Sequence, residues 1–166
     1  MMPKRFWIVL GVVVAVVLIG FVTFYYLDPS RAVVTGSILK VRVQPVDESS
    51  CLVVVDFRFI NSSTSVVVVR SVAMEIEDQS GKPVQGEPLS EMDAKRLMDY
   101  YPLLGQKYNE TLLMKTKIEP RQSMDRMVAA RFAIPDSQFN ARKQLKVEIE
   151  DWGGPVSVIE QVVGKK

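Results

Sequence analysis

The strongest constraint on this chain is an unbroken apolar run near its N-terminus. Residues 6–27 (FWIVLGVVVAVVLIGFVTFYYL) hold 19 apolar residues among 22 positions, and none of the side chains is charged. At about 1.5 Å per residue, a helix of this length spans about 33 Å, enough to cross a hydrocarbon core of about 30 Å. The run therefore predicts a transmembrane helix over residues 6–27, with the lipid bilayer as its partner.

A cleaved signal peptide is the main alternative to this anchor. Its apolar region would have only about 7 to 15 residues before a small-x-small cleavage site. The nearest such site, Ser30-Arg31-Ala32, lies beyond Asp28-Pro29, and the apolar run is too long. We therefore expect an uncleaved signal-anchor in the cell membrane.

The charges that flank the run predict its orientation. Lys4 and Arg5 precede it, whereas Asp28 and then Arg31 follow it. Because basic residues favour the cytoplasmic side, the N-terminus is expected in the cytoplasm. The sequence thus predicts a cytoplasmic stub over residues 1–5 and a folded domain outside the cytoplasm, which is the periplasm in a Gram-negative cell.

A small-xxx-small pattern, Gly11-x-x-x-Ala15, lies inside the apolar run. Such pairs let two membrane helices approach closely, so Gly11 and Ala15 are candidate helix-packing residues of a homodimer. Single-pass helices also contain such pairs by chance, and a monomeric anchor stays open as the alternative.

After the run, the chain changes to the two-residue alternation of β-strands. Residues 28–36 are expected to form a linker, and a domain is expected over 37–163. Its first strand shows Leu39, Val41 and Val43 on one face, with polar side chains on the other. Further strands are expected over 53–60, 66–76, 112–118, 124–134, 145–151 and 155–162. Many short strands joined by turns favour a mostly β, antiparallel sandwich over parallel βαβ units.

The third strand is expected to direct alternate residues into the core and to bend at Arg70-Ser71. The alternate residues are Val66, Val68, Val72, Met74 and Ile76.

A helical insertion over residues 89–108 interrupts the β pattern. Ser90 is a predicted N-cap, with Asp93 three residues later, and Pro102 ends the helix. One apolar face is formed by Ala94, Leu97, Met98 and Tyr101. We expect this helix to cover an open end or edge of the sandwich. A second short helix is expected over 136–142.

The loop after the first helix is the alternative place for a binding role, because loops carry function more often than the elements they connect. Tyrosine is enriched in protein interfaces. Tyr100, Tyr101 and Tyr108 are therefore the candidate interface residues.

Catalysis and metal binding find little support in the composition. The chain has no His, which excludes Ser-His-Asp chemistry and imidazole metal ligands. Its single Cys, Cys51, leaves no CxxC pair and lacks a His to activate it. The excess of 21 basic over 19 acidic residues equals Lys4 and Arg5 alone, so nucleic acid is not an expected partner. We expect no enzyme activity, no cofactor and no metal site.

Two segments of the chain have similar sequences, namely residues 74–84 and 147–156. Both read as a strand, an acidic end, a Gly-containing turn, Pro-Val and a second strand, which predicts two similar hairpins. A weaker alternative is a calcium site built from Asp78 and Asp151 with neighbouring Glu residues. Calcium needs about six to eight oxygen ligands, and neither segment has the alternating acidic loop of an EF-hand.

Two short motifs match the acceptor pattern for N-glycosylation. They are Asn61-Ser62-Ser63 and Asn109-Glu110-Thr111. They matter only in a eukaryotic secretory compartment, and the sequence does not specify the organism.

The pattern of strands and turns over residues 37–160 resembles two known families. Residues 52–63, 72–78 and 81–84 are similar to the first half of late-embryogenesis-abundant group 2 (WHy) domains. Residues 118–135 resemble the closing strands of bacterial membrane-anchored immunoglobulin-like domains of unknown function. The resemblance implies an immunoglobulin-like β-sandwich and carries over no catalytic residues. Together with the anchor, it implies a protein-interaction or envelope-assembly module with an unknown protein partner, or alternatively a stress-protective module.

Overall fold

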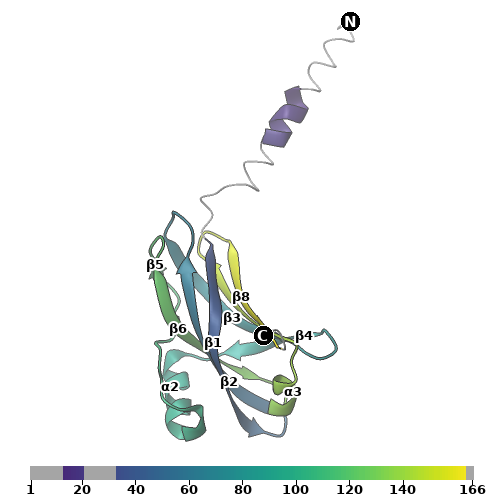
Figure 1. Cartoon of the computed structure of the whole chain (residues 1–166), viewed down its shortest axis with the longest axis vertical. Helices are drawn as coiled ribbons and strands as arrows, with labels where there is room; N and C mark the ends of the chain where they lie inside the picture. Colours follow the sequence, from purple (N-terminus) through teal and green to yellow (C-terminus); the bar gives the residue numbers. More distant parts are fainter. Residues whose placement is uncertain (1–12, 21–32, 164–166) are drawn as a thin grey trace, which may run out of the picture. The chain divides into compact units, whose positions relative to one another are not determined.

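The computed structural model describes residues 13–20 and 33–163 of the chain (Figure 1). The chain divides into two compact units, Met1–Arg31 and Ala32–Lys166. In the first unit, residues 13–20 are helical and their side chains are exposed. The rest of the predicted transmembrane segment, including Gly11, lies outside the described residues, and no described helix is long and apolar enough to cross a bilayer.

The second unit is a mostly antiparallel β structure with two helices and one 3-10 turn. The strands are β1 Val34–Asp47, β2 Ser50–Asn61, β3 Val67–Glu77, β4 Pro83–Pro88, β5 Lys117–Ile118, β6 Ser123–Phe132, β7 Gln144–Asp151 and β8 Val156–Val162. The helices are α2 Glu91–Tyr100 and α3 Asp136–Asn140, and the 3-10 turn is η1 Pro102–Leu104. These elements confirm the predicted mostly β, antiparallel sandwich with a helical insertion.

The strands follow one curled path, β1-β2-β6-β4-β3-β7-β8, with β5 attached to β3. β4 is the corner of this path, because its first residues pair with β3 and its last two, Glu87 and Pro88, pair with β6. At the other side, the Val34 amide donates to the Ser157 hydroxyl at 2.9 Å, so β1 returns to β8 (Figure 1). The sheet therefore encloses its own core.

Aromatic and branched side chains fill the core between the two halves of the sheet. The Phe132 and Phe139 rings lie 5.1 Å apart, which fixes α3 against β6. Each large apolar side chain that is fully buried stabilises the fold by about 1.5–3 kcal/mol. The largest of them in this core are Phe57, Phe59, Phe132, Phe139, Met74, Ile76, Ile118, Leu145, Ile149 and Ile159.

The structure of β3 corrects the prediction of which of its residues face the core. Val66 is exposed and Val68 only half-buried, whereas Val67 and Val69 are buried in the core. The pairing of β3 with β7 skips a residue between Val69 and Ser71. An extra residue at such a bulge moves every following side chain to the opposite face, so the alternation changes parity where the predicted bend lies.

Residues 34–36, which the sequence assigned to the linker, are the start of β1. Thr35 and Gly36 pair with Ile60 and Phe59 of β2. A Cβ at position 36 would overlap the Arg58 carbonyl oxygen and lie 2.9 Å from the Phe59 Cα. The glycine that suggests a flexible linker is instead required by close strand packing.

The segment predicted as a strand over 112–118 is mostly irregular, and only Lys117–Ile118 forms β5. Lys115 has a φ of 66°, in the left-handed region, and its amide donates to the Val69 carbonyl. This turn prevents a longer ladder. The two predicted hairpins are confirmed as β3–β4 and β7–β8.

Candidate interaction surface

The helical insertion begins at an N-cap that the sequence predicts correctly. The Ser90 Oγ accepts a hydrogen bond from the Asp93 amide at 3.1 Å and donates to the Asp93 carboxylate at 2.7 Å. At the other end of α2, the Tyr101 amide donates to the Leu97 carbonyl, and Pro102 then starts η1. Acidic side chains in the first turn suit the positive end of the helix dipole.

The insertion lies on the outer face of β2 and β6, not at an end or edge of the sandwich as predicted. Ala94, Met98 and Leu104 form a second small core with Val54 of β2 and the neighbouring face of β6. β2 is buried on both faces as a result, which explains its continuous apolar sequence from residue 51 to 55. The physical reason for the correction is that this outer face is itself apolar and needs a cover.

A buried ion pair fixes the chain that follows η1. The Arg42 guanidinium donates to the Asp56 carboxylate at 2.7 Å, and their side chains are only 6% and 4% exposed. Arg42 also donates to the carbonyls of Leu104 at 2.6 Å and Gln106 at 2.9 Å. The Asn109 amide completes the network by donating to Asp56 at 2.9 Å. Strands β1 and β2 therefore hold the loop at both of its ends.

The network leaves large apolar side chains exposed on a fixed backbone. Leu103 is 88% exposed, Tyr100 75% and Tyr108 62%. We call Tyr100, Leu103 and Tyr108 the insertion surface. Tyr108 is held in place by Lys40 and Arg42, whose charges lie 5.0 and 5.4 Å from its ring centroid.

The three predicted interface tyrosines thus play different parts. Tyr100 and Tyr108 are exposed, whereas Tyr101 packs against the second small core. The rings of Tyr100 and Tyr101 are in edge contact, with centroids 4.8 Å apart. Tyr101 is half-buried, so less of its side chain than of Tyr100 or Tyr108 is accessible.

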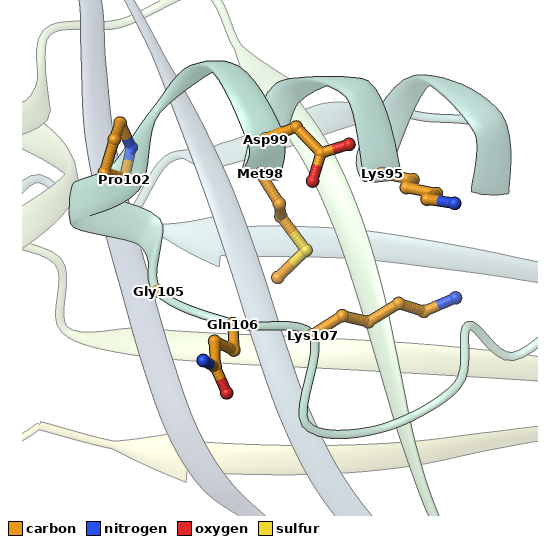
Figure 2. Close-up of a pocket in the computed structure, with 7 residues that line it drawn as sticks. All are labelled: Lys95, Met98, Asp99, Pro102, Gly105, Gln106 and Lys107. Carbon is orange, nitrogen blue, oxygen red and sulfur yellow. The ribbon is translucent and has the colours of Figure 1, made fainter.

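A cleft of about 350 Å³ lies between α2 and the loop after η1 (Figure 2). Lys95, Met98 and Asp99 line it from the helix, and Gln106 and Lys107 line it from the loop. The Lys107 ammonium forms an ion pair with Glu91 at 2.8 Å. The cleft presents mixed charge beside the insertion surface.

Sequence reasoning misses the Arg42–Asp56 network. The alternation in β1 places Arg42 on a solvated face, yet the loop after η1 covers it. The available signal is Asp56 itself, a single carboxylate inside an apolar strand, since buried charges are almost always paired. The sequence does not identify Arg42 as the partner of Asp56, because a bulge between Ile38 and Lys40 shifts the register of β1 on β2.

Cys51 is fully buried, and burial raises the pKa of its thiol to about 11, with a smaller contribution from the negative charge of Asp136. A shift from 9.0 to about 11 lowers the reactive thiolate about a hundredfold near neutral pH. Cys51 is a packed core residue and not a nucleophile.

We expect iodoacetamide at pH 8 to alkylate Cys51 of the folded protein at least about a hundredfold more slowly than in urea-unfolded protein, because both the pKa and access oppose the reaction. Mass spectrometry of the intact protein over time measures both rates. Alkylation of the folded protein at the unfolded rate would contradict the buried position.

The calcium alternative does not fit the geometry. β3 and β7 are antiparallel, so Asp78 and Asp151 lie at opposite ends of the sandwich. The Ser80 hydroxyl and then the Lys82 amide lower the pKa of the Asp78 carboxyl, and both bonds close its own turn. Within the described residues, no group of three or more His, Cys, Asp or Glu is placed to hold a metal ion.

The two glycosylation motifs differ in access. Asn61 is fully buried, and both hydrogens of its amide are used, by the carbonyls of Ser65 at 2.8 Å and Ile118 at 3.0 Å. Asn109 is half-buried and bonded to Asp56. Asn61 cannot accept a glycan in the folded domain.

No family model matches the chain, and no curated protein matches it. The resemblance to WHy domains therefore stays a prediction. Among solved structures, the chain is similar to the archaellum periplasmic stator protein FlaG from Sulfolobus acidocaldarius, at 8% identity and a TM-score of 0.37 over 78% of this chain and 99% of that one. It is also similar to an uncharacterized β-sandwich protein from Clostridium difficile 630, at 10% identity and a TM-score of 0.38 over 76% and 83%. At TM-scores this low, neither likeness assigns a function to the chain.

Proposed function

We propose that this chain is a single-pass membrane protein that presents a non-catalytic, immunoglobulin-like sandwich outside the cytoplasm. In this proposal, the domain binds another protein through the insertion surface. The observation that carries the proposal is an almost fully exposed leucine, Leu103, on a backbone fixed by the buried Arg42–Asp56 network.

Pre-organisation is the physical reason for choosing this surface. Binding energy in protein interfaces concentrates in a few large side chains, and ordering a mobile loop reduces affinity. Tyr100 and Tyr108 add broad contact area with few rotatable bonds beside Leu103. Because Arg42 already bonds to the Leu104 and Gln106 carbonyls, little ordering remains when a partner binds.

The strand order supports the immunoglobulin-like assignment. In that fold, strands A-B-E-D form one sheet and C-F-G form the other. Here β1-β2-β6-β4 and β3-β7-β8 follow the same order, with β4 shared between the halves. The anchor over residues 6–27 and the cytoplasmic N-terminus rest on the apolar run and on Lys4 and Arg5.

The test is in-cell crosslinking of the full-length chain in its native membrane. The double variant Tyr100→Ala, Leu103→Asp is expected to lose its crosslinked protein partner while keeping a wild-type thermal transition, because both side chains are exposed. Tyr101→Ala is not suitable, since Tyr101 packs against the second small core and its removal would also lower stability.

The matched control is Val158→Asp, which places a charge at an exposed apolar position on β8, away from the insertion. It is expected to keep the partner. An unchanged crosslink in the double variant, or an equal loss in the control, would contradict the insertion surface. Suppression of client aggregation by the wild-type domain, with no crosslinked partner, would favour the stress-protective alternative.

A further inference from the structure

The end of the sandwich at which β1 begins, here called the proximal end, has its own surface chemistry. Val34 at the start of β1 pairs with Asn61 at the end of β2. The starts of β3, β6 and β8 and the end of β7 lie at the same end. Its loops and turns comprise residues 62–66, 119–122 and 152–155.

Trp152 projects from the proximal turn between β7 and β8, with 61% of its surface exposed. The turn is rigid, because the Trp152 amide donates to the Val68 carbonyl at 2.8 Å. The Asp151 carboxylate accepts from the Val68 amide at 2.7 Å and from the Gly153 amide at 3.0 Å. Gly154 then takes a φ of 103°, which only glycine adopts easily. A fixed turn thus exposes an indole ring that the core does not use.

The surroundings of Trp152 combine apolar and cationic side chains. Three exposed valines share the proximal end, namely Val33, Val66 and Val156. Lys117 and Arg121 are exposed there, with Glu119 as the acidic residue of the same segment. Indole rings and basic residues beside apolar surface are the groups that lie at a membrane–water interface.

The turns at the opposite, distal end carry a small acidic excess and no exposed tryptophan. They hold Asp47, Glu48, Asp78 and Asp136 against Lys82, Arg142 and Lys143. The two ends of the sandwich are therefore not equivalent toward an anionic lipid surface.

Chain length keeps the proximal end near the membrane. Only residues 28–33 separate the predicted anchor from β1, and six residues span at most about 20 Å. β1 alone, with 14 residues, extends about 45 Å toward the distal end. The anchor thus brings the lipid surface within reach of Trp152.

We propose that the proximal end rests on the bilayer, with the Trp152 indole at the level of the lipid headgroups and Lys117 and Arg121 beside anionic lipid. This inference rests on the membrane anchor of the proposed function. Figure 1 shows α2 toward the other end of the domain, so the contact directs the insertion surface away from the lipid.

The test uses the full chain with Trp7→Phe, which leaves Trp152 as the only tryptophan of the original two. The variant is reconstituted into vesicles of phosphatidylcholine and phosphatidylglycerol, in which some phosphatidylcholine carries a spin label on its headgroup. The spin label is expected to quench most of the fluorescence of Trp152. Its emission maximum is expected at a shorter wavelength than that of the same domain, residues 33–166, in buffer without lipid or detergent. The control variant, Trp7→Phe, Trp152→Phe, Leu103→Trp, is expected to keep its emission.

Failure of the anchor and failure of the lipid contact give different results. A chain that an alkaline wash removes from the vesicles overturns the anchor and, with it, this inference. A chain that stays in the vesicles with an unquenched Trp152 overturns the lipid contact alone. A shorter emission wavelength without quenching indicates that Trp152 contacts a second copy of the chain, and it also overturns the lipid contact. Equal quenching of the Leu103→Trp control overturns the lipid contact as well.

Discussion

Replacing Arg42 by alanine is expected to lower the free energy of unfolding of the domain by about 3–5 kcal/mol, because it leaves the buried Asp56 carboxylate unpaired. The same change removes the donors to the Leu104 and Gln106 carbonyls. Urea unfolding of residues 33–166, followed by circular dichroism, measures the loss. Hydrogen exchange of the Leu104–Asn109 amides should accelerate before global unfolding.

The matched control is the exposed pair Arg58–Asp125, which joins β2 and β6 through two bonds of 2.6 and 2.7 Å. Water screens that pair, so Arg58→Ala is expected to stay close to wild type despite the similar geometry. Arg42→Lys keeps the positive charge but loses the shape of the guanidinium fork, which one ammonium cannot reproduce. This variant therefore distinguishes the contribution of the charge from that of the fork geometry. Equal losses for Arg42→Ala and Arg58→Ala would contradict the role given to burial.

Asn61→Asp is expected to lower the free energy of unfolding by about 3 kcal/mol, and the melting temperature by roughly 10 °C, although the side chain keeps its shape. The wild-type amide makes all of its bonds, donating to two carbonyls and accepting from the Ser63 amide at 3.0 Å and hydroxyl at 2.7 Å. A carboxylate would turn an acceptor toward the carbonyls of Ser65 and Ile118. Thermal unfolding of residues 33–166 measures the effect.

Ser62→Ala is the control for this position. Ser62 is exposed, and its hydroxyl bonds only to the exposed Thr35 hydroxyl at 2.8 Å, so the change is expected to stay within about 0.5 kcal/mol of wild type. Asn61→Ala should fall between the two, because it removes the donors without adding a charge. A stable Asn61→Asp variant would contradict the described hydrogen bonds.

Local patterns predict the elements of this fold better than they predict which side chains face inward. The cap at Ser90 and the stop at Pro102 depend on neighbours within a few residues, and both match the structure. In β3, Val72, Met74 and Ile76 face inward as predicted, but Val66 and Val68 do not, because a bulge after Val69 shifts the register. The sequence predicts a bend at Arg70-Ser71, but the change of parity there depends on pairing with β7, which lies far along the chain.

The candidate site was predictable only in part for a similar reason. Exposed Tyr100 and Tyr108 follow from the apolar face of α2 and from the loop composition. The helical spacing already places Tyr101 on the apolar face with Met98, as the structure shows. The exposure of Leu103 was not predictable, because it depends on η1 turning this side chain outward. Charged residues on a strand usually face water, whereas Arg42 is buried because a distant loop closes over it.

The pairing of β1 with β2 also decides how the domain would carry a mechanical load. A pull between the predicted anchor and a partner on the insertion surface acts along β1, whereas its hydrogen bonds to β2 run across the strands. Under such a load these bonds shear together instead of opening one after another from an end. The Arg42–Asp56 ion pair bridges the same two strands, so the load would pass through a side-chain link as well as through the backbone ladder.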